Sequence, residues 1–195
     1  MKVFIVFCHP GKISFTHSIL NSFIFGLKSA GHDYVISDLY DMKFKTDISE
    51  IEYFKETNYR AEIPVSEDIM KEQNKIQGCN AIVFIYPVFW TEAPAKLVGW
   101  FDRVWTTGYA YNPNPTMKML DKALFLVCAG KTLESLEETG EKAAMETVML
   151  GDRFRNRARN KEMIIFDGIT HWNEEQRNEK IPKHLAEVFE IGRGL

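Results

Sequence analysis

The sequence predicts an α/β fold in which five parallel strands form a doubly wound sheet, in the order 2-1-3-4-5, with helices on both faces. Five short apolar runs, rich in β-branched and aromatic residues, alternate with longer segments of helical periodicity. This alternation is typical of a parallel sheet buried on both faces. The 195 residues contain no internal repeat, and 45% of them are hydrophobic. We therefore expect one domain that spans residues 1–195.

The first apolar run, residues 3–7, has the composition of a strand buried on both faces. A loop follows, after which Ser14 is placed to cap a helix. Four apolar residues at helical spacing give that helix a buried stripe: Phe15, Ile19, Phe23 and Leu27. Gly31 ends the helix. The second strand, 34–39, mixes polar and apolar residues, so we expect it at an edge of the sheet.

Residues 40–65 show no clear period, and we expect an irregular excursion with one short helix. Pro64 and Ser66 introduce a helix that runs to residue 77 and ends at Gly78. Residues 80–86 form the third buried strand. After a loop at 87–93, Pro94 opens a helix that extends to residue 105, because proline is favoured in the first turn.

The last third of the chain continues the alternation. A proline-containing loop at 108–120 precedes a fourth strand at 122–128. A single helix is expected from about residue 133 to residue 150, then a fifth strand at 163–166 and a final helix at 174–191. In a doubly wound sheet the ligand lies at the carboxyl ends of the strands, where the winding reverses. The site is therefore expected in the loops 8–14, 87–93 and 128–132.

Composition excludes several classes of function. The net charge of −3 does not indicate nucleic-acid binding, and no apolar run approaches the length of about 20 residues that spans a bilayer. Three cysteines, Cys8, Cys79 and Cys128, cannot pair completely, so we expect free thiols in a reducing cytoplasm. No Ser-His-Asp arrangement, metal-ligand cluster or carboxylate pair stands out, and we expect no metal site. An enzyme built on these loops would depend on a cofactor.

The three loops carry distinct chemistry. The first, which begins with His9 and ends at the expected start of a helix, suits an anion because free N–H groups and the helix dipole lie there. The second places Phe89 and Trp90 at the mouth of the expected site, where aromatic rings suit a flat ligand. Neither a P-loop nor a G-x-G-x-x-G pattern occurs. Folding of the aromatic rings into the core remains an alternative for the second loop.

Several of these residues resemble a known family. The resemblance rests on His9-Pro-x-x-x-Ser14-Phe15, on Gln73, and above all on the long ordered stretch from Tyr86-Pro87-x-x-Trp90 to Tyr111. This set of residues is similar to the matching residues of the flavodoxin-like NAD(P)H:quinone oxidoreductases of the DT-diaphorase type. The bacterial relatives of that type include modulator-of-drug-activity proteins and the ancillary flavoproteins of potassium-efflux systems. The likeness is strong over residues 1–130.

The resemblance implies a role for matching positions of this chain. His9, Ser14, Phe15 and Thr16 would hold the flavin phosphates, and Gln73 would contact the flavin nucleotide. The isoalloxazine ring would lie along Pro87, Val88, Phe89 and Trp90, with its polar edge at Cys128, Ala129, Gly130 and Lys131. The Lys131 cation would stabilise a reduced anionic flavin. Trp90 and Tyr111 would serve catalysis, and Tyr111 would reach the substrate pocket of the partner subunit in a homodimer.

The implied activity is two-electron, ping-pong hydride transfer from NADPH or NADH to a quinone-like acceptor. The cofactor would be FAD, favoured by Ser14, Phe15 and Gln73, with Arg177 at its adenine end and FMN as the alternative. Asp102 would hold the loops rather than react. Three other functions stay open: an electron-transfer flavodoxin, a regulatory flavoprotein of a membrane potassium-efflux system, and an enzyme that uses a thiol of Cys8 or Cys128.

Overall fold

The computed structural model describes residues 1–195 and contains one parallel sheet in the order β2-β1-β3-β4-β5. The strands are β1 (Lys2–Phe7), β2 (Asp33–Asp38), β3 (Ala81–Pro87), β4 (Leu120–Cys128) and β5 (Ala158–Phe166). The helices are α1 (Phe15–Ser29), α2 (Glu50–Thr57), α3 (Glu67–Gln77), α4 (Ala95–Val104), α5 (Leu133–Glu138), α6 (Glu141–Glu146) and α7 (Glu174–Arg193). A π-helical segment, η1 (Thr147–Phe154), precedes β5. The predicted fold class and strand order are confirmed.

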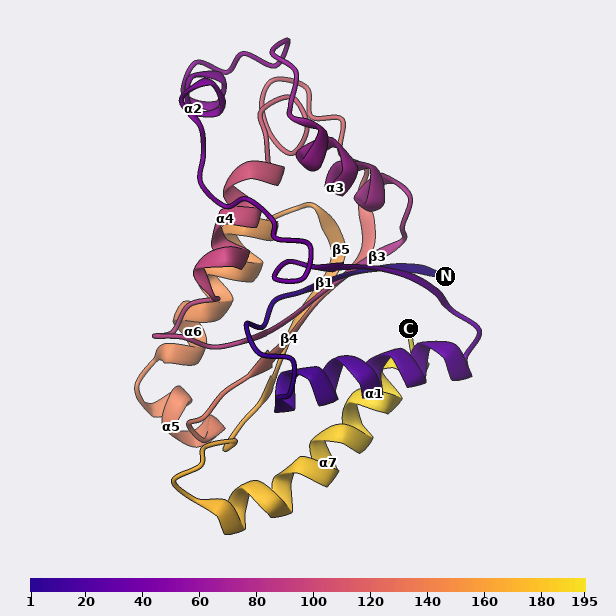
Figure 1. The fold of residues 1–195 in the computed structure, drawn as a ribbon, viewed down its shortest axis with the longest axis vertical. Helices are drawn as coiled ribbons and strands as arrows, with labels where there is room; N and C mark the ends of the chain where they lie inside the picture. The colour runs from indigo at the N-terminus through magenta and orange to yellow at the C-terminus, as the bar shows by residue number, and fades with distance from the viewer.

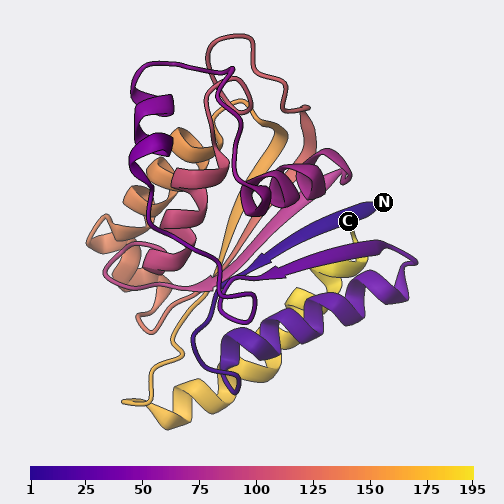
Figure 2. The same cartoon turned by 45° about the horizontal axis from the view of Figure 1, so that its top comes forward.

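Helices cover both faces of the sheet (Figure 1). Figure 2 shows the indigo α1 and the yellow α7 together on one face, and the magenta α4 with the orange helical segment on the other. Side chains alternate along each strand, so Val3 and Ile5 pack with α1 and α7, whereas Phe4 and Val6 pack with α4. Every residue from Val3 to Phe7 is fully buried, as the continuous apolar run predicted.

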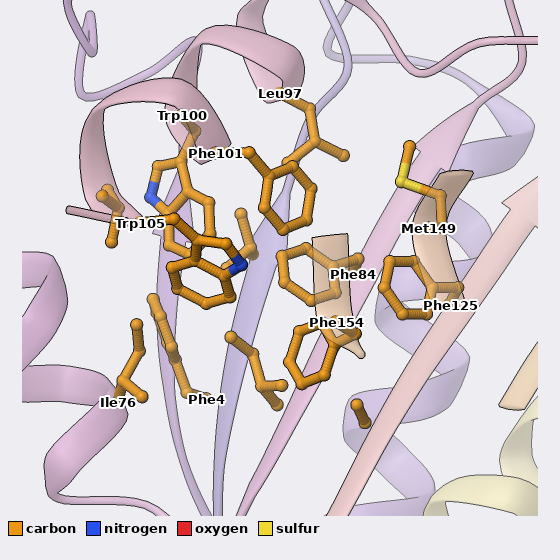
Figure 3. Close-up of a cluster of buried hydrophobic side chains, with 14 of the residues drawn as sticks. Phe4, Ile76, Phe84, Leu97, Trp100, Phe101, Trp105, Phe125, Met149 and Phe154 are labelled. Carbon is orange, nitrogen blue, oxygen red and sulfur yellow. The ribbon is translucent and has the colours of Figure 1, made fainter. Parts of the chain in front are cut away.

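The face under α4 is an aromatic core (Figure 3). Phe84 of β3 lies at its centre, with ring centroids 4.8 Å from Phe125, 5.7 Å from Trp100 and 5.9 Å from Phe154. All four side chains are buried. The indole N–H of Trp100 donates to the buried carboxylate of Glu72 at 2.9 Å, so the only polar atom in this group is satisfied.

The irregular segment between β2 and α3 is held against α4 by Arg103. Its guanidinium forms ion pairs with Glu52 and Asp68, both at 2.6 Å, and donates to the carbonyl of Lys45 at 2.8 Å. Only 3% of the Arg103 side chain is exposed. Burial alone would raise the pKa of Asp68, but hydrogen bonds from Arg103 and Ser66 outweigh it and lower that pKa to about 2. Arg103 therefore organises a segment that has no periodic pattern of its own.

The prediction of a single helix at 133–150 was wrong, because the structure divides this stretch into α5, α6 and the start of η1. Gly140 adopts a left-handed conformation with φ of 74°, and this residue separates α5 from α6. Continuous i→i+4 bonding stops again at Thr147, where η1 begins. The apolar residues keep helical spacing on both sides of Gly140, so the sequence pattern did not reveal the break in the helix.

The fifth strand begins at Ala158 rather than at residue 163. Its first half, Arg159 to Glu162, is polar and largely exposed because β5 is an edge strand with β4 as its only neighbour. The prediction relied on apolar residues and therefore found only the apolar, partly buried half.

The carboxyl ends of the central strands are level with one another. Phe7 of β1 pairs with Ile85 of β3, and Cys128 of β4 pairs with both Pro87 and Phe166. The ladder continues one residue into the loops, where the N–H of Val88 donates to Cys128 at 2.9 Å. Four loops therefore leave the sheet along the same edge, as the doubly wound topology requires.

Helices α1 and α7 cross in close contact, and this contact depends on two glycines. A Cβ at Gly26 would lie 2.1 Å from the Phe189 carbonyl oxygen, and one at Gly192 would lie 2.4 Å from the Phe23 carbonyl oxygen. These atoms belong to backbone, which cannot move aside without shifting a helix. The close approach brings the first turns of both helices to the same side of the sheet.

Replacing Gly192 with Ala is expected to destabilise the protein by about 1–3 kcal/mol, the usual effect of overpacking. Helix propensity alone predicts the opposite sign, since Ala is favoured over Gly by about 1 kcal/mol. The measurement is urea unfolding followed by circular dichroism. Gly151→Ala is the matched control, because its new Cβ would meet nothing closer than 3.9 Å. A Gly192 variant as stable as the parent would show that the helices do not cross as described.

Candidate active site

A cleft of about 710 Å³ lies at the carboxyl ends of β1, β3 and β4. Nine of the residues predicted from the sequence line it: His9, Ser14, Phe15, Thr16, Pro87, Val88, Cys128, Ala129 and Gly130. Six further residues complete the lining: Ile13, Ser18, Ile169, His171, Arg177 and Ile181. The volume falls within the range of about 300–1,000 Å³ found for small-molecule sites.

One wall of the cleft is the first turn of α1. Ser14 has an extended backbone, and its Oγ accepts the N–H of His17 at 3.2 Å, which makes Ser14 the N-cap as predicted. The N–H groups of Phe15 and Thr16 make no hydrogen bond within the chain, since first-turn donors have no intrahelical acceptor. The turn before them is closed by the Gly11 N–H, which donates to His9 Nδ1 at 3.0 Å. This wall can bind an anion.

The opposite wall is the loop after β4. Its first residue, Ala129, stays in the sheet because its N–H donates to the Phe166 carbonyl at 3.0 Å. The next two N–H groups, those of Gly130 and Lys131, have no acceptor within the chain. They add a second set of backbone donors next to the apolar surface of Val88. The cleft therefore combines apolar walls with donors at two ends.

Arg177, in the first turn of α7, is the residue of the cleft with the most unusual environment. Its Nε is buried and has no hydrogen-bond partner, and its guanidinium forms no ion pair. A buried charged donor without an acceptor is costly unless a ligand supplies one. No aspartate or glutamate lines the cleft, whereas His9 and His171 do. The electrostatic character of the cleft therefore favours a ligand with negative groups.

The imidazole of His17, next to the cleft, is held as a neutral group. The ring of His17 lies 4.5 Å from that of Phe7 and 5.8 Å from that of His9. Burial lowers the pKa of His17, and the neighbouring His9 lowers it further. His17 therefore adds no positive charge at neutral pH, whereas Arg177 and the backbone dipoles do.

The thiols are poor candidates for catalysis. Cys128 lines the cleft, but burial raises its pKa to about 12, with only partial compensation from a hydrogen bond with Thr16. Burial likewise raises the pKa of Cys8 to about 12. Because the thiolate is the nucleophile, neither side chain is activated near neutral pH. This argues against the thiol-dependent enzyme.

The aromatic residues of the second loop do not fold into the core. Residues Phe89 to Glu92 form a tight turn closed by two backbone hydrogen bonds, of 2.8 Å and 3.0 Å. Trp90 and Thr91 at its tip both have positive φ, of 52° and 65°, which is rare for residues other than glycine. The Trp90 side chain is 99% exposed, so its indole can meet a planar molecule. Such strain often accompanies functional sites.

Five of the predicted residues lie outside the cleft lining: Phe89 and Trp90 of the exposed turn, and also Gln73, Tyr111 and Lys131. Gln73 donates to the Val104 carbonyl and to Thr106 Oγ1, both at 3.0 Å, and so ties α3 to the end of α4. Tyr111 lines a separate groove of about 560 Å³, and its hydroxyl donates to the Glu56 carboxylate. Lys131 pairs with Glu141 at 2.7 Å.

Asp102 lies in the groove that Tyr111 lines, and burial raises its pKa. The second oxygen of Glu56, Oε1, is buried there without a partner.

The sequence did not predict the part of the cleft lining that the loop after β5 and Ile181 of α7 supply. Ile169 and His171 follow β5, and Ile181 lies on α7 one turn after Arg177. No sequence motif marks these residues. The packing of α7 against α1 brings Arg177 and Ile181 to the cleft. Arg177 was named as a candidate, but from resemblance rather than from any local pattern.

No group of three or more histidine, cysteine, aspartate or glutamate side chains is gathered so as to hold a metal ion. None of the helices is both long enough and apolar enough to cross a membrane.

Known proteins share this architecture. A family model described as flavodoxin-like fold matches residues 1–190. The solved structure of an NAD(P)H:quinone oxidoreductase from Methanothermobacter marburgensis is 41% identical, with a TM-score of 0.92 over 100% of this chain and 95% of that one. The chain belongs to the flavodoxin-like family of NAD(P)H:quinone oxidoreductases. The suspected family is thereby confirmed.

Curated relatives match over shorter stretches. A ribosyldihydronicotinamide dehydrogenase [quinone] from Homo sapiens is 31% identical over 71% of this chain and 68% of its own length. An NAD(P)H dehydrogenase [quinone] 1 from Cavia porcellus is 32% identical over 56% of this chain and 45% of its own length. The chain thus spans about half the length of several curated relatives that it matches.

The residues that line this cleft suit the flavin that the family implies. The free N–H groups of Phe15 and Thr16 and the unpartnered Arg177 suit phosphate oxygens. Val88 and Ala129 supply an apolar surface for a flat ring, and the Gly130 N–H is a donor for its polar edge.

Proposed function

We propose that this chain is a flavin-dependent NAD(P)H oxidoreductase that passes two electrons to quinone-like acceptors. The cleft carries the proposal, because backbone donors and an unpartnered guanidinium face a space with apolar walls and no carboxylate. Such a space suits a flat ligand that ends in phosphate groups. Membership of the quinone oxidoreductase family supports the same activity.

The residues of the cleft would divide the work of binding. The first turn of α1, with Ser14, Phe15, Thr16 and the adjacent His9, would hold phosphate groups through N–H donors and the helix dipole. Pro87 to Trp90 would flank the ring, and the segment from Cys128 to Lys131 would bind its edge through the free backbone N–H groups of Gly130 and Lys131. When bound there, a flavin supplies the two-electron redox chemistry that side chains lack.

The exposed turn after β3 would receive the two substrates. Trp90 offers a free indole face for the nicotinamide or for a planar acceptor, and Phe89 is 46% exposed beside it. Because one surface would serve donor and acceptor in turn, the oxidised nicotinamide must leave before the quinone binds. Ping-pong kinetics follow from this order.

Anaerobic stopped-flow mixing of the flavin-loaded protein with NADPH or NADH tests the function. The flavin absorbance is expected to bleach within the turnover time, and a second mixing with a benzoquinone is expected to restore it. Reciprocal plots at several quinone concentrations should be parallel. Free flavin at the same concentration is the control.

The other outcomes separate the alternatives. Flavin that binds but stays oxidised with both nicotinamides would reject the reductase and favour an electron-transfer flavodoxin. A purified protein that takes up neither FAD nor FMN would reject every flavin-based function. Flavin released by heat and separated by chromatography identifies which of the two is bound.

We further propose FAD rather than FMN as the cofactor. The cleft extends from the first turn of α1 to His171 and Arg177, which leaves room beyond the α1 donors for the adenine half of FAD. FMN carries one phosphate, which the α1 donors would satisfy. FAD carries a second phosphate and an adenosine, which would reach the α7 side and give the buried Arg177 Nε an acceptor.

Replacing Arg177 with Leu is therefore expected to weaken FAD binding by about tenfold or more, the effect of losing a charged hydrogen bond. FMN affinity should stay within about twofold of the parent. Fluorescence titration of the apoprotein with each flavin measures both constants. Arg193→Leu, on the same helix but 58% exposed, is the matched control. Equal losses for FAD and FMN would contradict the assignment of Arg177 to the adenine half.

We also propose that the chain forms a homodimer. Several large apolar side chains are exposed on and around α2, at the top of Figure 1: Ile48, Ile51, Tyr53, Phe54 and Tyr59. Clusters of this kind mark interfaces. The groove that Tyr111 lines also includes Ile48 and Tyr59, so a partner that covers α2 would bring Tyr111 to an intermolecular position.

Sedimentation velocity at micromolar concentration is expected to give the mass of two chains. Phe54→Asp should shift the distribution toward one chain, because it places a charge in an apolar contact. Phe25→Asp is the control, since Phe25 is 64% exposed on α1, away from α2. A parent protein that sediments as one chain would reject the dimer.

A further inference from the structure

Glu141, the first residue of α6, gathers three side-chain donors. Both its oxygens accept from the Lys131 ammonium, at 2.7 Å and 2.8 Å, and Oε2 also accepts from Thr139 Oγ1 at 2.8 Å. Oε1 faces Thr91 Oγ1 at 3.4 Å. The left-handed Gly140 turns the chain so that Glu141 returns toward the sheet.

These contacts join two loops that border the cleft. Thr91 lies at the tip of the turn after β3, which follows Pro87 and Val88 of the lining. Lys131 lies in the loop after β4, next to Ala129 and Gly130. No other ion pair involves either loop tip; the nearest, Glu92–Arg153, leads away from the cleft to η1. Glu141 is therefore the one carboxylate that links the tips of both loops.

The pair also determines where the Lys131 charge is. The ammonium is neutralised by both oxygens of Glu141, and Lys131 does not line the cleft although Ala129 and Gly130 do. Hydrogen bonds from Lys131 and then from Thr139 lower the pKa of Glu141. The carboxylate is thus ionised at neutral pH, and the pair is lost only as the pH falls through that lowered pKa.

We propose that Glu141 is a positioning residue that ties the β3 and β4 loops together and holds the Lys131 cation off the cleft. This inference rests on the proposed function for its effect on the flavin, but the tether itself is a property of the chain alone. A free Lys131 ammonium would lie beside the ring edge and stabilise a reduced, anionic flavin. Glu141 suppresses that effect and so keeps the reduced cofactor more strongly reducing.

The variants that test this are Glu141→Gln, Lys131→Met and the double variant. Glutamine keeps the shape of the side chain and removes its charge, so Lys131 is released. Glu137→Gln is the matched control, because Glu137 forms an ion pair with Lys142 at 2.7 Å that touches neither loop.

Hydrogen exchange of the apoprotein tests the tether without any cofactor. Amides of residues 88–93 and 129–132 are expected to exchange about threefold faster in Glu141→Gln, in line with a partly exposed ion pair. They should not change in Glu137→Gln. Unchanged exchange in Glu141→Gln would overturn the tether whether or not flavin binds.

The midpoint potential of the bound flavin tests the effect on charge. Glu141→Gln is expected to raise the potential, and the rise should vanish in the double variant, where no cation remains to be released. A rise that persists without Lys131, or no rise in the single variant, would overturn the inference. A protein that binds no flavin would reject the proposed function instead, and the exchange experiment would still decide the tether.

Discussion

The structure depends on one topological constraint, the reversal of winding between β1 and β3. Parallel strands are joined by right-handed crossovers, so α1 leads from β1 to β2 on one face, whereas α4 leads from β3 to β4, in the opposite direction across the sheet, on the other face. The two crossovers diverge at the carboxyl ends of β1 and β3, and neither can cover the gap between them. The cleft is that gap, and its backbone donors follow from the same geometry, because α1 must begin there.

Packing then decides how wide the gap is. The aromatic core around Phe84 fixes α4 on one face, and the contact through Gly26 and Gly192 fixes α7 against α1 on the other. Since α7 can approach so closely, its first turn places Arg177 at the cleft. The buried and unpartnered Nε of Arg177 is thus a consequence of helix packing rather than of a local motif. It is also the clearest sign that the cleft receives an anion.

Polar contacts at the rim of the cleft support a turn that core packing does not hold. The turn at Trp90 and Thr91 holds two non-glycine residues at positive φ, a backbone conformation that costs free energy and needs support from its surroundings. Support comes from Glu92, paired with Arg153 at 3.0 Å, and from Glu141 beside Thr91. These contacts link the cleft to α6 and η1, the region where the broken helix departs from a regular crossover. The irregular segment thereby serves the rim of the site.

The sequence by itself determined the fold class, the strand order, the edge position of β2 and the three loops of the site. Apolar runs at 3–7 and 80–86 and the cap at Ser14 are local signals, and burial in a parallel sheet leaves few alternatives for them. Only the tertiary structure decided that Gly140 breaks a helix, that Gln73 and Tyr111 lie outside the cleft lining, and that Lys131 is neutralised by Glu141. These outcomes depend on contacts between residues remote in sequence or on a backbone conformation that an apolar period does not record. A local pattern can place a loop at the edge of a sheet, but the direction of each side chain depends on what packs against it.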